Sequence, residues 1–140
     1  MTDEMKNLIL QYVDSVQKIY GTHLKQVILY GSYARGDFTE DSDVDLMILV
    51  DLNEEETGQF SDELSELGFE YNVGHDIWMM PVVKNIQNFF KWSAAYPFYR
   101  NVKEEGVSLY DKTTPRLIQF HILKNAVNPP FLGGFLFSAQ

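Results

Sequence analysis

The chain begins with apolar residues at helical spacing and continues with short apolar runs. The first pattern, in which apolar residues recur every three or four positions, predicts an amphipathic helix over residues 3–20 that ends at Gly21. Residues 26–30 and 44–50 are rich in strand-forming residues, and each run is typical of a buried strand. Helix and strand therefore alternate in the first part of the chain.

The same alternation continues towards the end of the sequence. Asn53 and Glu56 have the spacing of a capping box, which predicts a helix from 53 to about 67. Residues 76–82 predict a third strand that proline ends. The remaining expected elements are helices over 85 to about 95, 97 to about 105 and 115 to about 126, and a short edge strand over 107–110. This order indicates an α/β (α+β) fold.

Composition limits the chain to one domain. Its 140 residues, 45% of them hydrophobic, are enough for one core, so we expect a single domain over 1–140 with a C-terminal extension from about 111. Cysteine is absent, which excludes a disulfide framework and a thiolate zinc site. No signal peptide and no apolar run of membrane-spanning length is found, so a cytoplasmic protein without membrane contact is expected.

The formal net charge of −9 excludes one class of partner. Long nucleic acids bind mainly through neutralisation of their phosphates by Lys and Arg, which makes them poor substrates for an acidic chain. A nucleoside triphosphate that carries its own magnesium remains acceptable, because a few local cations suffice. A basic protein partner is also compatible with this charge.

A Gly-Ser pair directly follows the first predicted strand. Gly31 has no side chain to block a phosphate, and the Ser32 hydroxyl can donate a hydrogen bond to it. The next backbone N–H groups face the same point if a short helix begins at Tyr33. Arg35 adds a positive charge nearby, although a salt bridge to Asp37 or Asp41 would also explain it. The pattern predicts a phosphate-binding turn.

Two carboxylates open the second predicted strand. Because side chains alternate along a strand, Asp43 and Asp45 lie on the same face. Two carboxylates so close repel each other unless a cation lies between them, and hard oxygen ligands suit magnesium or manganese. We therefore expect Asp43 and Asp45 to bind a divalent cation.

Taken together, Gly31-Ser32, ten intervening residues and Asp43-x-Asp45 resemble the signature of the DNA polymerase beta-type nucleotidyltransferase superfamily. The small size resembles its minimal nucleotidyltransferase family. The likeness is strong over 26–50 and less specific through 110. It implies the nucleotidyltransferase fold, a small mixed β-sheet flanked by helices, and a metal-dependent transfer of a nucleoside monophosphate. ATP or another nucleoside triphosphate would be the substrate and two Mg²⁺ ions the cofactors.

The superfamily usually supplies a third carboxylate from a neighbouring strand. Asp76 is the preferred candidate because it opens the third predicted strand, where one face would carry Asp76, Trp78 and Met80. Glu70 is the alternative, although the second predicted helix should end near it. The third carboxylate would hold the second metal and take the proton of the acceptor.

The resemblance also suggests an acceptor. Minimal nucleotidyltransferases typically occur beside a HEPN protein, and members are known as antitoxins that AMPylate a tyrosine of that toxin. Protein AMPylation is therefore the leading hypothesis. Two alternatives stay open: transfer to a small molecule such as an aminoglycoside, and a non-catalytic module that neutralises its partner by binding it.

Two apolar features remain unassigned. An aromatic cluster over 89–99 would either stack a nucleobase or, more often for such clusters, form core or a partner interface. The apolar segment 131–137 is too short to span a membrane and is expected to pack on the domain or on another subunit. A dimer or a heteromeric complex is therefore favoured over a monomer.

Overall fold

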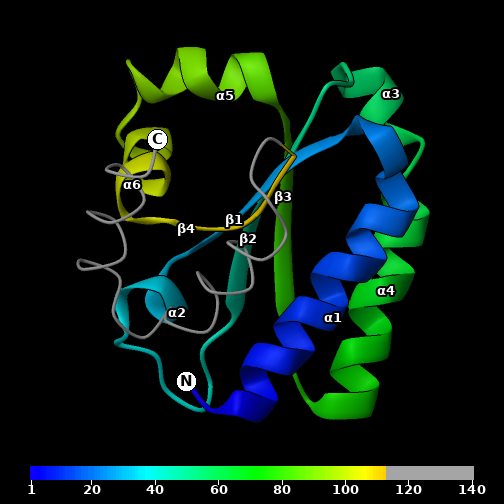
Figure 1. Cartoon of the computed structure of the whole chain (residues 1–140), viewed down its shortest axis with the longest axis vertical. Helices are drawn as coiled ribbons and strands as arrows, with labels where there is room; N and C mark the ends of the chain where they lie inside the picture. Colours follow the sequence, from blue (N-terminus) through cyan, green and yellow to red (C-terminus); the bar gives the residue numbers. More distant parts are fainter. Residues whose placement is uncertain (113–140) are drawn as a thin grey trace.

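The computed structural model describes residues 1–112, which form a four-stranded sheet between two layers of helices (Figure 1). The strands are β1 (Leu24–Tyr30), β2 (Val44–Val50), β3 (Met79–Asn85) and β4 (Val107–Asp111), in the order β3-β2-β1-β4. β1 pairs antiparallel with β2 and β4, whereas β2 and β3 are parallel. The predicted mixed sheet is confirmed.

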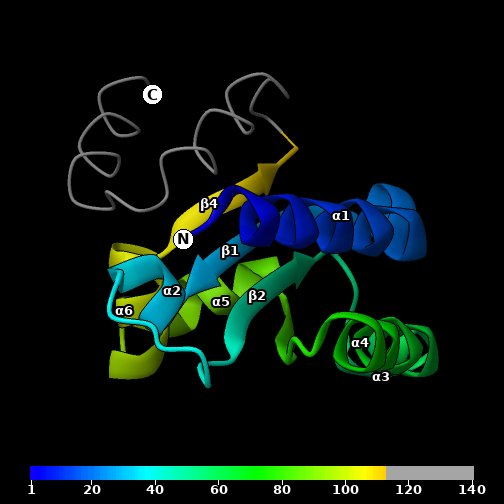
Figure 2. The same cartoon turned by 90° about the horizontal axis from the view of Figure 1, so that it is seen from below.

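Helices cover both faces of the sheet. Figure 2 shows α1 (Asp3–Tyr20) and α4 (Ser61–His75) to one side, with α5 (Ile86–Ser93) and α6 (Pro97–Glu105) on the other. Short elements lie in the connections from α1 to β1, from β1 to β2 and from β2 to α4: a 3-10 turn over Gly21–His23, α2 (Ser32–Arg35) and α3 (Glu54–Gly58). None of the helices in residues 1–112 is long and apolar enough to cross a membrane.

The central strand β2 is buried on both sides, which explains its nearly continuous apolar sequence. Val44, Leu46 and Ile48 pack with residues of α1 and α4 in the larger core cluster. Met47 and Leu49 point to the opposite face and pack with Phe89 and Val102 of α5 and α6. The carboxylates Asp43 and Asp45 precede Met47 and Leu49 on this second face.

The prediction of a single helix over 53–67 is wrong in two respects. It is interrupted between α3 and α4, and α4 continues past Gly68 to His75. Burial explains the extension, because Leu64, Leu67 and Tyr71 keep the helical spacing and pack against the core. The predicted capping box is confirmed: the Asn53 side chain accepts from Glu56 N, and the Glu56 side chain accepts from Asn53 N.

The third strand also differs from its prediction. Asp76 caps the C-terminus of α4 in the left-handed conformation, with φ of 55°, and β3 begins only at Met79. Nor does proline end the strand. Since the Trp78 carbonyl accepts from Val44 N and bonding alternates along the strand, the nitrogen of Pro81 faces the free edge, where it needs no partner.

The other expected elements agree closely with the structure. α5 and α6 correspond to the helices predicted over 85–95 and 97–105, and β4 corresponds to the edge strand predicted over 107–110. The helix predicted over 115–126 and the apolar segment 131–137 lie outside the described residues.

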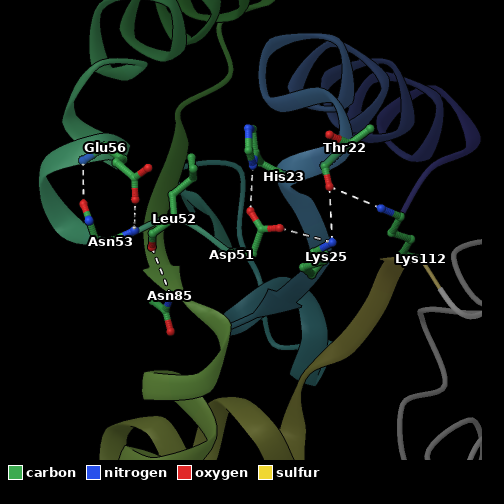
Figure 3. Close-up of polar contacts among 9 residues, drawn as sticks. All are labelled: Thr22, His23, Lys25, Asp51, Leu52, Asn53, Glu56, Asn85 and Lys112. Atoms are coloured by element: carbon green, nitrogen blue, oxygen red, sulfur yellow. Dashed lines mark hydrogen bonds and ion pairs between the residues drawn. The ribbon is translucent and has the colours of Figure 1, made fainter.

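Polar contacts fasten the end of the sheet that lies away from the start of β2 (Figure 3). Asp51 accepts from His23 Nδ1 at 2.8 Å and pairs with Lys25 Nζ at 3.3 Å. The hydrogen bond from His23 is the main cause that lowers the pKa of Asp51. Asn85 Nδ2 donates to the Leu52 carbonyl at 3.1 Å, which links β3 to the segment after β2. The opposite end of the sheet carries the candidate site.

Candidate active site

The turn after β1 has the geometry that its glycine makes possible. Gly31 has φ of 72°, a conformation that residues with a side chain rarely adopt. Its carbonyl accepts from Ala34 N at 3.1 Å and from Arg35 N at 3.0 Å, so the chain enters α2 at Ser32. The turn is as predicted, and the short helix, considered from Tyr33 in the sequence, begins one residue earlier.

Gly31 lies directly against one of the two carboxylates. Tyr30 is paired with Asp45 across the β1–β2 ladder, which places the next residue of the turn beside the Asp45 side chain. A β-carbon at Gly31 would overlap Asp45 Oδ2 and lie 3.1 Å from Asp45 Cγ. The absence of a side chain at Gly31 thus allows the carboxylate to touch the turn.

The pKa of Asp45 reflects its burial and the charged groups around it. Its pKa is raised first by burial and then by the charge of Asp43, while the Arg35 guanidinium opposes the shift. Asp45 is half-buried and Asp43 is exposed. The structure therefore brings Asp43, Asp45, Gly31 and Arg35 to one end of the sheet, as the sequence predicts.

Arg35 also makes the ion pair that the sequence offered as its structural role. Its Nε donates to Asp37 Oδ2 at 3.3 Å, and both side chains are about half exposed or more. Exposed ion pairs contribute little to stability, because water screens them and ordering both side chains costs entropy. Breaking the ion pair with Asp37 so that Arg35 can bind a phosphate oxygen would therefore cost little free energy.

The third carboxylate has no place on β3. Asp76 is exposed at the end of α4, and Glu70 is exposed on the same helix. On the face that carries Asp43 and Asp45, β3 presents Met80 instead, and Trp78 directly precedes the strand. Among residues 1–112, no three acidic or histidine side chains are grouped closely enough to hold a metal ion. The assignment of Asp76 remains a prediction.

The two carboxylates fit a divalent cation by their chemistry. Burial and then the like charge of Asp43 raise the pKa of Asp45, and a cation between the two carboxylates would remove their repulsion. Carboxylate oxygens are also the ligands that Mg²⁺ and Mn²⁺ prefer, together with water and substrate phosphates. Asp43 and Asp45 are therefore suitable residues to hold the ion.

Sequence reasoning offered the aromatic cluster over 89–99 for nucleobase stacking but did not assign Tyr30 to this site. Tyr30 has a pKa raised by burial and by Asp45, and its ring meets Phe98 of α6 edge-on at 5.8 Å between centroids. The aromatic cluster over 89–99 divides accordingly, since Phe89 is core whereas Tyr96 and Phe98 are exposed. The available signal was the position of Tyr30, directly before Gly31 on a strand end.

Comparison with known proteins identifies the family of this chain. Residues 9–106 match the family described as nucleotidyltransferase domain. A relative from Methanocaldococcus jannaschii, named "putative protein adenylyltransferase", is 33% identical over 102 residues, which cover 73% of this chain and 94% of the relative. A second protein of that organism with the same designation is 35% identical over 106 residues, covering 76% of this chain and 99% of the relative.

Among solved structures, this chain is similar to one from a mutant of the toxin–antitoxin pair MntA–HpeT. The TM-score is 0.48 at 15% sequence identity, covering 86% of this chain and 84% of that chain. The family match spans more than half of the chain, and both relatives exceed 30% identity over nearly their whole length. This chain therefore belongs to the nucleotidyltransferase domain family.

Proposed function

We propose that this chain transfers AMP from ATP, with magnesium, to a tyrosine hydroxyl of a HEPN-type partner protein and so acts as its antitoxin. The observation that carries the transferase chemistry is the contact between Asp45 and the Gly31 turn, with Asp43 on the same strand face. That contact joins a phosphate-binding turn to a cation-binding pair. The names of the two relatives favour a protein as acceptor.

Each residue of the site has a proposed role. Ser32 and the backbone after Gly31 would bind the phosphates of the leaving pyrophosphate. Arg35 would release Asp37 and bind a phosphate oxygen instead. Asp43 and Asp45 would hold Mg²⁺, which supplies charge neutralisation for the triphosphate and lowers the pKa of the acceptor hydroxyl. The protein then contributes mainly by positioning the reactants.

The HEPN partner is proposed from the resemblance to minimal nucleotidyltransferases. The net charge of −9 is consistent with a basic protein partner. The partner need not be identified before the first test, because transfer from alpha-labelled ATP marks the acceptor protein covalently.

Transfer of label from alpha-labelled ATP with magnesium to proteins of a source-organism lysate tests this proposal. The Asp43→Asn, Asp45→Asn double variant should lose labelling by at least about a hundredfold, since no cation would be held. Asp41→Asn is the matched control, because it removes an exposed carboxylate from the same loop and should leave labelling unchanged. Labelling that survives the double variant would contradict the proposal.

A second candidate is supported by the lack of a carboxylate on β3 opposite Asp45. A site with a weak hold on its cation could serve as a binding module that neutralises a partner by covering it. In that case the wild-type chain would neither label a protein nor bind magnesium-ATP, and the double variant would still neutralise the partner.

The third carboxylate is tested separately. Asp76→Asn removes the charge and keeps the backbone, because Asn tolerates the left-handed conformation well. We expect this variant to lower the transfer rate by about tenfold or more, in keeping with the loss of a proton acceptor. Glu70→Gln, on the exposed face of α4, is the control and should be active. The reverse ranking would move the assignment to Glu70.

A further inference from the structure

The sheet order separates two flanks of the candidate site. β2, which carries the carboxylates, lies between β1 and β3. The end of β1 leads into the phosphate-binding turn, with Gly31 against Asp45. The other flank of Asp45 is Met80 of β3, its register partner in the parallel ladder. Phosphate-binding groups and β3 are therefore on opposite sides of the carboxylate pair.

Phosphoryl chemistry gives these flanks different roles. The attacking and leaving oxygens lie roughly in line through the phosphorus atom. If the α-phosphate is at Asp43 and Asp45 and the leaving pyrophosphate at Gly31 and Ser32, the acceptor must approach from the side of β3. This step rests on the proposed function.

The β3 flank is apolar and open. Trp78 is 58% exposed and Met80 45% exposed, although both are large hydrophobic residues beside a polar site. Met80 is the register partner of Asp45, and Trp78, whose neighbours Ile77 and Met79 are buried in the larger core cluster, points to the same face as Met80. Further along this face, Val82 packs with Phe89 under α5, so the helices leave only the end near the carboxylates uncovered.

We infer that Trp78 and Met80 form the acceptor subsite and hold the ring of a tyrosine. The indole of Trp78 can contact an aromatic ring edge-to-face or offset-stacked, and the thioether of Met80 can contact it through sulfur. A cationic aminosugar would instead need several carboxylates around it, whereas the two exposed side chains at the start of β3, Trp78 and Met80, are uncharged. The subsite therefore selects a phenol over an aminoglycoside hydroxyl.

The proposed transfer forms one bond and breaks one bond at the α-phosphorus. The phenolic oxygen forms a bond to the α-phosphorus, and the bond from that phosphorus to the bridging oxygen of pyrophosphate breaks. Pyrophosphate leaves with the electron pair, and the phenolic proton passes to the general base, for which Asp76 is the proposed residue, and from there to water. Trp78 and Met80 take no part in these bonds, so they act as positioning residues for the acceptor.

The test uses the full chain, alpha-labelled ATP and two defined acceptors, N-acetyl-tyrosinamide and kanamycin. Wild type should label the tyrosine probe and not kanamycin. Trp78→Ala and Met80→Ala should each raise the KM for the tyrosine probe by about tenfold, the loss of one aromatic or sulfur contact. The KM for ATP should stay within about twofold, because the phosphate flank is untouched.

Phe69→Ala is the matched control. Phe69 is 67% exposed on α4, so its truncation removes an equally large apolar side chain away from the carboxylate face and should change neither KM. Trp78 and Met80 variants that keep the wild-type KM for the tyrosine probe overturn the subsite while leaving the transferase intact. Absence of wild-type transfer to both probes overturns the proposed function and the subsite with it. Efficient labelling of kanamycin reverses the acceptor assignment alone.

Discussion

Gly31 is the residue on which the site depends most directly. Gly31→Ala places a β-carbon into Asp45 Oδ2 at a backbone φ of 72°. We expect AMP transfer to fall by about a hundredfold or more, because displacement of a charge-stabilising group by a fraction of an ångström has effects of that size. The measurement is kcat/KM for transfer, together with the melting temperature.

A second glycine separates the clash from backbone strain. Gly36 also has a positive φ, 86°, but a β-carbon there would meet nothing within 4 Å. Gly36→Ala should therefore cost about 1 kcal/mol of stability, the usual penalty at such a position, and keep its activity. Equal activity losses in the two variants would show that strain alone matters, and the contact with Asp45 would lose its assigned role.

Asp45 should destabilise the metal-free protein at neutral pH. Its pKa is raised in the fold by burial and by Asp43, so the protonated form favours folding at low pH and this contribution is lost as pH rises through the folded pKa. Asp45→Asn cannot ionise. In EDTA it should melt several degrees above wild type at neutral pH, and the gap should close below about pH 4, near the ordinary carboxyl pKa.

Magnesium provides the internal control for this experiment. If the cation binds the wild-type pair as proposed and not the variant, added Mg²⁺ should raise the melting temperature of wild type and narrow the difference between the two. Asp41→Asn, on the exposed loop, should melt with wild type at both pH values. A variant that melts below wild type in EDTA at neutral pH would contradict the assigned burial and repulsion.

At the scale of elements, Asn85 joins β3 to its neighbours (Figure 3). Its side chain accepts from Asn88 N at 3.1 Å as the N-cap of α5, and donates to the Leu52 carbonyl at 3.1 Å. Asn85→Ser should keep the cap and lose the bond to Leu52, at about 1 kcal/mol. Asn85→Ala should lose both, at about 2 kcal/mol, and urea unfolding would measure each. Equal costs would mean that one of the two bonds contributes nothing.

Elements defined by local rules were predictable from the sequence. The Gly31 turn, the alternation of Asp43 and Asp45 and the Asn53 capping box each depend on residues close together in the chain, and the structure confirms them. The length of α4 was not predictable in this way, because the packing of Tyr71 against Tyr12 of α1 is a tertiary contact. Once α4 extends to His75, Asp76 becomes its cap.

For the whole molecule, the sheet order is what creates the site, and no local pattern predicts that order. The parallel pairing of β2 with β3 sets Met80 against Asp45 and leaves Trp78 uncovered. The resemblance to nucleotidyltransferases indicated the fold, whereas Asp76, the candidate for the third carboxylate, lies before β3 at the end of α4 and stays a prediction. The comparison of Asp76 with Glu70 and the subsite test therefore address the same flank.

The segment after Lys112 should govern association rather than catalysis. Residues 113–140 contain no Asp or Glu, so the cation-binding carboxylates must come from the preceding residues or from a partner. The same segment contains the apolar run 131–137, which is the strongest candidate in the sequence for contact with another subunit. Removal of residues 113–140 would also delete Arg116 and Lys124 and leave a net charge of −11, which adds to repulsion between copies.

Truncation after Lys112 tests this division. The cut preserves the bonds that close the sheet, since Lys112 N donates to the Lys25 carbonyl at 3.1 Å and Lys112 Nζ to the Thr22 carbonyl at 3.2 Å (Figure 3). We expect the truncated chain to bind magnesium-ATP as the full chain does and to be monomeric by light scattering at concentrations where the full chain self-associates. Because β4 still pairs with β1, circular dichroism should show a folded protein. Identical masses for the two chains at every concentration would place the association surface, if one exists, within residues 1–112, whereas loss of nucleotide binding in a folded truncated chain would assign the segment a part in the site.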